Sequence, residues 1–273
     1  MAAAALSSLA AFAERWADAN TRRRIGRALE VVPVIGSTND RARELLVEAD
    51  GDGAVVVADE QTAGRGRRGR TWQSPPGRNL YLSVALVPAL AAVDAWRLGL
   101  ATALAVAGAC ETVARIDLKW PNDVVAAGDG RKVAGLLVET MVESDRLRGA
   151  VLGIGINVNW RRSEMPADLR EGASSLADVR GASVDREELL GRLLDTLETE
   201  VAAVEAGISP LARYRARCST LGATVEVQTA DGLVTGRALD LDSSGALVVE
   251  DGDGRRHVVS GGEVTRVRPA VPA

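Results

Sequence analysis

Up to about residue 217, the apolar and polar positions alternate between strand-like and helix-like patterns. Short Val-, Ile- and Leu-rich runs predict strands at residues 29–35, 54–58, 79–87, 116–119, 124–126, 132–141 and 148–159. Helices are expected in an alanine-rich leader and at residues 37–48, 91–113, from 185 onward and 209–217, with a loop before residue 178. Ser37 is a plausible N-cap, and Asp185 with Glu188 has capping-box spacing.

Beyond Cys218 the pattern changes to short strands at tight spacing. Five strands are expected, at residues 224–228, 233–241, 246–250, 255–259 and 264–267, separated by Asp-Gly, Ser-Ser-Gly and Gly-Gly turns. Five short strands in about fifty residues are typical of a small barrel. The chain is therefore divided into a leader helix with a basic linker (1–25), a main domain (26–217) and a barrel (218–268).

Composition limits the function without identifying it. The chain has 273 residues, of which 47% are hydrophobic and 26% charged, as in ordinary globular proteins. A net charge of −4 argues against a general nucleic-acid binder. The N-terminus lacks the basic segment of a signal peptide, and the longest uncharged apolar run, Leu98 to Cys110, is shorter than the roughly 20 residues that span a bilayer. We therefore expect a cytoplasmic protein without a membrane partner.

Thiol, imidazole and metal chemistry are not indicated. Cys110 and Cys218 are far apart and form no CxxC pair, so they indicate neither a disulfide framework nor a zinc site. Cys110 lies in an apolar run and is expected to be buried and inert. His257 is the only histidine and falls in a predicted strand, which argues against a Ser-His-Asp or Cys-His device. The chemistry must then depend on charge stabilisation and positioning.

Residues 64–72, Gly-Arg-Gly-Arg-Arg-Gly-Arg-Thr-Trp, form the most informative segment. Its glycines match G-x-G-x-x-G, but Pro75 and Pro76 follow where a dinucleotide loop would open a helix. No acidic residue occurs between Gly69 and Asp94 to bind a ribose. Four arginines in six residues repel one another unless they surround a multiply charged anion. A solvated surface loop is the alternative, although the glycines would then serve no purpose.

The two lysines point to the same chemistry. Only Lys119 and Lys132 occur among 33 basic residues, and they lie 13 positions apart. Lys119 ends a predicted strand and Lys132 begins another, so a compact ammonium group is expected at a shared site. Chance placement of two surface lysines is the alternative.

Five motifs in order resemble the biotin protein ligases, and the resemblance covers Val32 to Val267. The motifs are Gly36-Ser-Thr-Asn39, Glu60-Gln-Thr-Ala-Gly-Arg-Gly-Arg-Arg-Gly-Arg70, Lys119-Trp-Pro-Asn-Asp123, Lys132-Val-Ala-Gly135 and Gly153-Ile-Gly-Ile-Asn-Val158. The resemblance implies an α+β fold, in which a mixed sheet flanked by helices precedes a small SH3-like barrel. It also implies that biotin and ATP form biotinyl-5′-AMP, from which biotin passes to one lysine of a biotin carboxyl carrier domain in a carboxylase.

The resemblance also implies residue roles. Lys119, Arg65 and Arg67 would be catalytic, because the first step brings a carboxylate up to a triphosphate and both anions must be neutralised. The implied biotin site consists of Ser37, Thr38, Asn39, Gln61, Gly64, Arg65, Gly66, Arg67, Lys119 and Gly135. The implied ATP site consists of Arg67, Arg70, Trp72, Asn122, Lys132 and Asn157. Mg²⁺ is implied by the triphosphate, with no dedicated protein ligands, since capping explains Asp123 equally well.

Several alternatives stay open. Trp72 and Trp120 are either aromatic walls for the ligands or core residues. A lipoate or octanoate ligase of the same superfamily is the nearest other enzyme. A biotin-sensing transcriptional regulator is a different class, but about 25 residues before the catalytic core are too few for a helix-turn-helix domain. Both a monomer and a weak homodimer fit the sequence.

The arginine-rich segment also carries a dynamic hypothesis. Glycine entropy and repulsion between arginines both oppose order in residues 64–77. We therefore expect the segment to be mobile without ligand and to order when biotin and the adenylate bind, sealing the anhydride from water.

Overall fold

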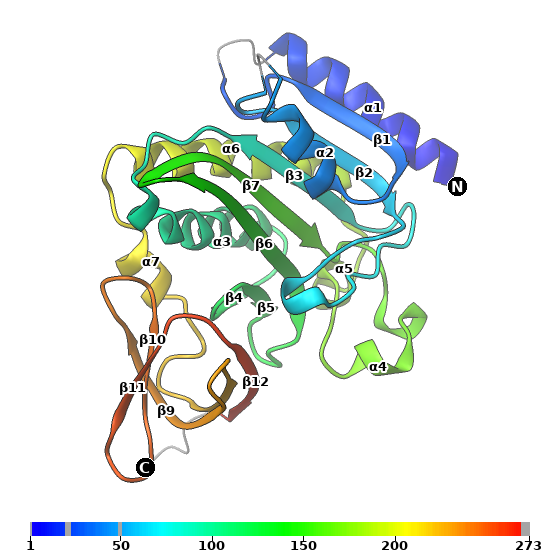
Figure 1. The fold of residues 1–273 in the computed structure, drawn as a ribbon. Coiled ribbons are helices and arrows are strands. Elements are labelled where there is room, and N and C mark those ends of the chain that lie inside the picture. Colours follow the sequence, from blue (N-terminus) through cyan, green and yellow to red (C-terminus); the bar gives the residue numbers. More distant parts are fainter. Residues whose placement is uncertain (1, 20–22, 49–50, 269–273) are drawn as a thin grey trace.

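A mixed seven-stranded sheet forms the centre of the computed structural model, which describes residues 2–19, 23–48 and 51–268 (Figure 1). The strands lie in the spatial order β1-β2-β3-β7-β6-β5-β4, and only β1 and β2 pair in parallel. They are β1 (Leu29–Ile35), β2 (Val55–Gln61), β3 (Leu80–Leu86), β4 (Ile116–Lys119), β5 (Asp123–Ala126), β6 (Lys132–Glu143) and β7 (Arg146–Ile156). The predicted mixed sheet is confirmed.

Helices flank this sheet on both faces. They are α1 (Ala2–Ala19), α2 (Thr38–Leu45), α3 (Trp96–Glu111), α6 (Arg186–Glu205) and α7 (Leu211–Arg215). Asp185 caps α6 as predicted, because its carboxylate accepts hydrogen bonds from the backbone N–H groups of Glu187 and Glu188. Ser37 occupies the N-cap position of α2, but its side chain makes no capping bond.

The segment predicted as a loop before residue 178 contains three short helices. They are η3 (Arg162–Glu164), α4 (Ala167–Arg170) and α5 (Leu176–Arg180). Two further short helices, η1 (Arg67–Gly69) and η2 (Ala92–Asp94), precede α3. Such single turns carry little hydrophobic periodicity, so the sequence pattern did not indicate them.

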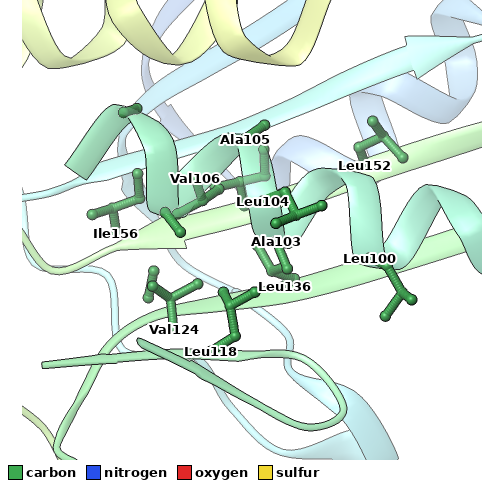
Figure 2. Close-up of a cluster of buried hydrophobic side chains, with 14 of the residues drawn as sticks. Leu100, Ala103, Leu104, Ala105, Val106, Leu118, Val124, Leu136, Leu152 and Ile156 are labelled. Carbon is green, nitrogen blue, oxygen red and sulfur yellow. The ribbon is translucent and has the colours of Figure 1, made fainter. Parts of the chain in front are cut away.

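The apolar core lies between the sheet and α3, with α6 packed outside α3. Leu104 and Val106 of α3 face Leu136, Leu152 and other strand residues in this layer (Figure 2). Residues 92–111 are long and apolar enough to cross a membrane, but 61% of that stretch is buried inside the molecule. The segment is the core helix of the domain.

The other face of the sheet carries α2 and is less apolar. Side chains alternate between faces along a strand, so Leu152 and Ile154 of β7 point to α3 whereas Gly153 and Gly155 point away from it. The same alternation puts Ser83 of β3 on the α2 side. Because Gly153 and Gly155 lack side chains and Ser83 has a small one, this face of the sheet is recessed at their positions.

The C-terminal β-domain is a five-stranded antiparallel sheet with the order β11-β10-β9-β8-β12. Its strands are β8 (Thr224–Gln228), β9 (Leu233–Leu241), β10 (Leu247–Glu250), β11 (Arg256–Val259) and β12 (Glu263–Arg268). Together with the main sheet, it agrees with the predicted α+β class. In Figure 1 the domain lies beside α7, β4 and β5, below the main sheet.

The basic linker after α1 packs against acidic groups of the main domain. Thr21 and Arg22 lie outside the described residues, but Arg24 is half-buried, not a solvated residue. Its guanidinium forms ion pairs with Asp52 (2.8 Å) and Glu205 (2.7 Å). The charges of this segment therefore balance acidic groups from two distant elements.

Candidate active site

A cavity of about 460 Å³ lies on the hollowed side of the sheet, between the sheet and the C-terminal β-domain. Of the residues assigned to the site from sequence, only Gly64 is absent from its lining. Those that do line it are Ser37, Thr38, Asn39, Gln61, Arg65, Gly66, Arg67, Arg70, Trp72, Lys119, Asn122, Lys132, Gly135 and Asn157. Gly64 instead packs behind the loop, where an added Cβ would come within 2.6 Å of the Trp72 carbonyl oxygen.

One end of the cavity is neutral and built from buried, mutually hydrogen-bonded side chains. Gln61 Oε1 accepts from the backbone N–H of Thr38 at 2.9 Å and lies 3.1 Å from the Thr38 hydroxyl. Ser83 Oγ is 2.7 Å from Thr38 Oγ1 and 2.6 Å from Asn39 Oδ1. Ser37, Thr38, Asn39 and Ser83 are each at most 5% exposed. This pocket is shaped before any ligand enters.

Two glycines of β7 make room for protein side chains. A Cβ on Gly153 would lie 2.2 Å from Asn39 Oδ1, and one on Gly155 would lie 2.5 Å from Cε2 of Trp72. Both glycines belong to the Gly153–Val158 motif. In the structure, Asn39 and Trp72 occupy that space and form the cavity wall.

The arginine-rich segment lies across the other end of the cavity. Arg65 donates two hydrogen bonds to Asp40, at 2.8 and 2.5 Å, and Arg70 pairs with Glu263 of the β-domain at 2.5 Å. Arg68 donates to the carbonyl oxygen of Gln228 at 3.0 Å. Acidic and carbonyl groups elsewhere in the chain therefore hold these arginines, which the sequence pattern did not indicate.

Arg67 is an arginine of this segment whose guanidinium is partly desolvated. Its guanidinium donates to the Gly262 carbonyl at 3.3 Å and to Asn122 Oδ1 at 3.5 Å, and it has no ion pair with the described carboxylates. Burial, together with the nearby charge of Arg68, lowers the pKa of Arg67. The hydrogen bond from Arg65, by contrast, lowers the pKa of Asp40. Arg67 is thus a partly desolvated cation that faces the cavity.

The two lysines line the same cavity but have different surroundings. Lys132 forms an ion pair with Asp123 at 2.6 Å, and its ammonium lies 5.1 Å from the centre of the Trp72 ring. Lys119, at the end of β4, has no ion pair with the carboxylates in the described part of the chain. Asp123 is therefore a partner of Lys132, and Lys119 is the lysine with an uncompensated charge.

The two tryptophans of the motifs, Trp72 and Trp120, lie in different environments. The Trp72 ring lies against Gly135 and Gly155 in the cavity wall, and its indole N–H has no hydrogen-bond partner in the described structure. Trp120 is 2% exposed and belongs mainly to the core. Its indole N–H donates to the Gly245 carbonyl in the β-domain at 3.1 Å. Trp72 therefore forms part of the cavity wall, whereas Trp120 connects the main domain to the C-terminal β-domain.

Several residues that shape the cavity were not identified from sequence, and Ser83, which bonds Thr38 and Asn39 from behind the lining, is one of them. Ser83 sits in an apolar run, and nothing in its local pattern indicates a polar contact. A second group comes from the short helices after β7: Trp160, Met165, Asp168, Leu169, Gly172 and Ala173. This group is fixed to the site by backbone hydrogen bonds from Lys132 to Gly172 (2.8 Å) and from Ser174 to Lys132 (2.9 Å).

Among the described residues, neither of the two cysteines nor His257 lines this cavity. Burial raises the pKa of the Cys110 thiol to about 12, in agreement with an inert core cysteine. His257 pairs with Asp251 in the β-domain. The described residues contain no cluster of three or more His, Cys, Asp or Glu side chains that would hold a metal ion.

Comparison with known sequences agrees with the resemblance to biotin protein ligases. Residues 31–157 match the biotin/lipoate A/B protein ligase family, and residues 220–266 match the biotin protein ligase C-terminal domain. The biotin–[acetyl-CoA-carboxylase] ligase of Mycobacterium tuberculosis is 39% identical over 251 residues, which cover 89% of this chain and 90% of that protein. The bifunctional ligase/repressor BirA of Bacillus subtilis is 34% identical, over 86% of this chain and 73% of that protein.

A solved structure agrees with the sequence comparisons. The biotin protein ligase from Aquifex aeolicus in complex with biotin and ATP superposes with a TM-score of 0.71 and 29% identity, covering 89% of this chain and 99% of that one. The identity over nearly the whole of the mycobacterial enzyme is high enough to establish common family membership. The chain therefore belongs to the biotin protein ligase family.

Proposed function

We propose that the protein is an ATP-dependent biotin ligase that acts in two half-reactions. In the first, a biotin carboxylate oxygen attacks the α-phosphorus of ATP, which forms biotinyl-5′-AMP and releases pyrophosphate. In the second, the amine of a carrier lysine attacks the biotinyl carbonyl, which forms an amide and releases AMP. The observation that supports this best is a single cavity with a prebuilt neutral pocket and three cations, Lys119, Arg67 and Arg68, that lack carboxylate partners in the described chain.

The neutral end suits the biotin ring system. Its ureido group presents two N–H donors and one carbonyl acceptor, so it needs a few fixed neutral partners, not charges. We assign Ser37, Thr38, Asn39 and Gln61 to this group, with Ser83 holding Thr38 and Asn39 in place. Because these side chains are buried, each lost hydrogen bond would leave an unsatisfied polar group.

The cationic end suits the reacting anions. We assign Lys119 to the biotin carboxylate and to the charge that develops on the α-phosphate. Arg67 and Arg65 are assigned to the phosphate groups, where charge-assisted hydrogen bonds are about twice as strong as neutral ones. Both cations act by lowering repulsion between two anions and by holding them in line.

The remaining lining residues are assigned to the nucleotide. Arg70, Trp72, Asn122, Lys132 and Asn157 form this group, in which Lys132 and Asn157 bond to residues 172–174 after the short helix α4. We assign Gly64, Gly66 and Gly135 to the biotin site, where the lack of a side chain lets the backbone come close to the ligand. Gly64 itself lies behind the loop. Mg²⁺ would arrive bound to the triphosphate oxygens, because the described residues offer no carboxylate cluster for it.

The wider context is proposed on the same basis. We assign residues 26–217 to adenylation and residues 218–268 to a β-domain that completes the site. The acceptor is a biotin carboxyl carrier domain of a carboxylase. The net charge of −4 argues against a nucleic-acid partner, and we propose a cytoplasmic location. A monomer and a weak homodimer stay equally open.

Isotope exchange between pyrophosphate and ATP tests the proposal. The purified protein is incubated with Mg²⁺, labelled pyrophosphate, ATP and one acid, either biotin, lipoate or octanoate. Exchange that requires biotin is the expected result. Exchange only with lipoate or octanoate would keep the adenylation chemistry but replace the substrate, and no exchange with any acid would contradict a ligase.

A further inference from the structure

The strand that carries Lys119 is bonded directly to the start of the C-terminal β-domain. The backbone N–H of Leu118 donates to the Arg217 carbonyl at 2.9 Å. The Leu118 carbonyl accepts from the backbone N–H of Ser219 at 2.8 Å and from its hydroxyl at 3.0 Å. The residue just before Lys119 is therefore fixed by the junction between the two domains.

The residue after Lys119 is fixed by the same junction. The backbone N–H of Trp120 donates to Thr220 Oγ1 at 3.0 Å, and both residues are buried, at 2% and 0% exposed. The Trp120 indole donates to the Gly245 carbonyl at 3.1 Å. Gly245 has a φ of +77°, and a Cβ there would lie 2.7 Å from Cε3 of Trp96 in α3. The turn at Gly245 thus packs closely against α3 as well.

Lys119 itself has no comparable restraint. Its ammonium makes no ion pair with the described carboxylates, so the position of its long side chain depends on the backbone on either side. That backbone is held by Ser219 and Thr220, not by the rest of the main sheet alone. The neutral pocket, in contrast, is built by side chains of α2, β2 and β3 that bond to one another.

We propose that Thr220 and Trp120 are positioning residues for Lys119, so that the C-terminal β-domain takes part in adenylation by fixing the catalytic lysine. This inference rests on the proposed function of the site. Misplacement of a reacting group by about 1 Å can lower a rate by about 10²-fold. Loss of the Thr220 hydroxyl should therefore lower kcat and leave the KM for biotin unchanged.

Thr220→Val is the principal test, because it keeps the shape of the side chain and removes the acceptor for the Trp120 N–H, together with the hydrogen bond between the Thr220 hydroxyl and Cys218. We expect kcat for biotin-dependent pyrophosphate exchange to fall about 10- to 100-fold, with little change in the KM for biotin. Thr220→Ser retains the hydroxyl and should restore most of the rate. Thr229→Val is the matched control, since that threonine bonds only within the β8–β9 turn and should leave exchange unchanged.

A second variant protects the test against misfolding. Trp120→Phe retains a large ring and removes only the bond to Gly245, so it should lower kcat in the same direction, with the melting temperature recorded for every variant. Wild-type kcat in Thr220→Val, or equal loss in Thr220→Val and Thr220→Ser, would overturn the inference. A wild-type protein without biotin-dependent exchange would instead overturn the proposed function, and this inference with it.

Discussion

The two ends of the cavity are built in different ways. At the neutral end, Thr38, Asn39 and Ser83 are almost fully buried and bond to one another, so the same contacts fold the protein and shape the pocket. At the charged end, Arg65 and Arg70 lie in an exposed segment and bond to Asp40 and Glu263 across the chain. Recognition of a neutral ring is therefore preorganised, whereas neutralisation of anions relies on cations whose present partners a phosphate can replace.

This difference leads to an expectation for mutations. Changes at the neutral end should affect substrate affinity and protein stability together, because buried hydrogen bonds serve both. Changes at the charged end should affect turnover while the melting temperature stays close to the wild-type value, because exposed ion pairs contribute little to stability.

The largest expected effect is at Lys119. Lys119→Met should lower kcat for pyrophosphate exchange by about 10²- to 10³-fold, the usual loss when one stabiliser of a developing anion is removed. Lys119→Arg should not restore the rate, since a planar guanidinium does not replace a compact ammonium. Unchanged melting of both variants would show that the loss is chemical, and exchange near the wild-type rate in Lys119→Met would contradict the assignment.

The second-largest effect is expected at Arg67, and it compares two neighbouring arginines of the same segment. Arg67→Ala should lower kcat/KM for ATP about 10- to 150-fold, corresponding to one charge-assisted hydrogen bond. Arg68→Ala is the matched control, because the adjacent exposed arginine bonds only a β-domain carbonyl among the described residues. Equal losses in steady-state kinetics of the two variants would show that the segment acts only through its total charge.

Ser83→Ala probes the neutral end. Removal of this buried hydroxyl leaves Thr38 and Asn39 each without one partner, and such a group costs about 1–3 kcal/mol. We expect biotin binding to weaken about 5- to 150-fold by calorimetry, with a lower melting temperature. The exposed Thr62→Ala variant should change neither quantity. Loss of biotin affinity without any loss of stability would break the proposed link between folding and recognition.

The smallest effect is expected at Asp40, which anchors Arg65 from an exposed position. Asp40→Asn should shorten the lifetime of bound biotinyl-AMP about 1.4- to 5-fold, the range for an exposed ion pair. Because Arg65 lowers the folded-state pKa of Asp40 below 3.8, the contribution of the pair is complete above the unfolded pKa and is lost only as the pH falls through the lowered value. The effect of the substitution should therefore be equal at about pH 6 and about pH 8, and adenylate release rates at the two values check this.

Much of the fold followed from local patterns. The predicted bounds of β1, β4, β8 and β9 agree with the structure, because each strand is a short apolar or alternating run closed by turn residues. Helices α4 and α5 were missed, since four or five residues carry no measurable periodicity. The place of α4 in the cavity wall is set by backbone bonds between Lys132 and the residues just after this helix, Gly172 and Ser174, which no local pattern encodes.

The site was predictable where a motif carries its chemistry. Thr38, Gln61, Lys119 and Asn157 all line the cavity as expected. The partners of the arginines were not predictable, because Asp40 and Glu263 lie 25 and 193 residues from the arginines they bind. Ser83 was missed for a related reason: its role depends on which face of β3 it occupies and on what α2 places above it.

Hydrogen exchange measured by mass spectrometry tests the contrast between the two ends most directly. Exchange is followed in residues 64–77 and in residues 80–86 of β3, without ligand and with biotin and ATP. The account predicts a large slowing across 64–77 and almost no change in β3, which is already ordered. Unchanged exchange across 64–77, or equal slowing in both segments, would contradict it.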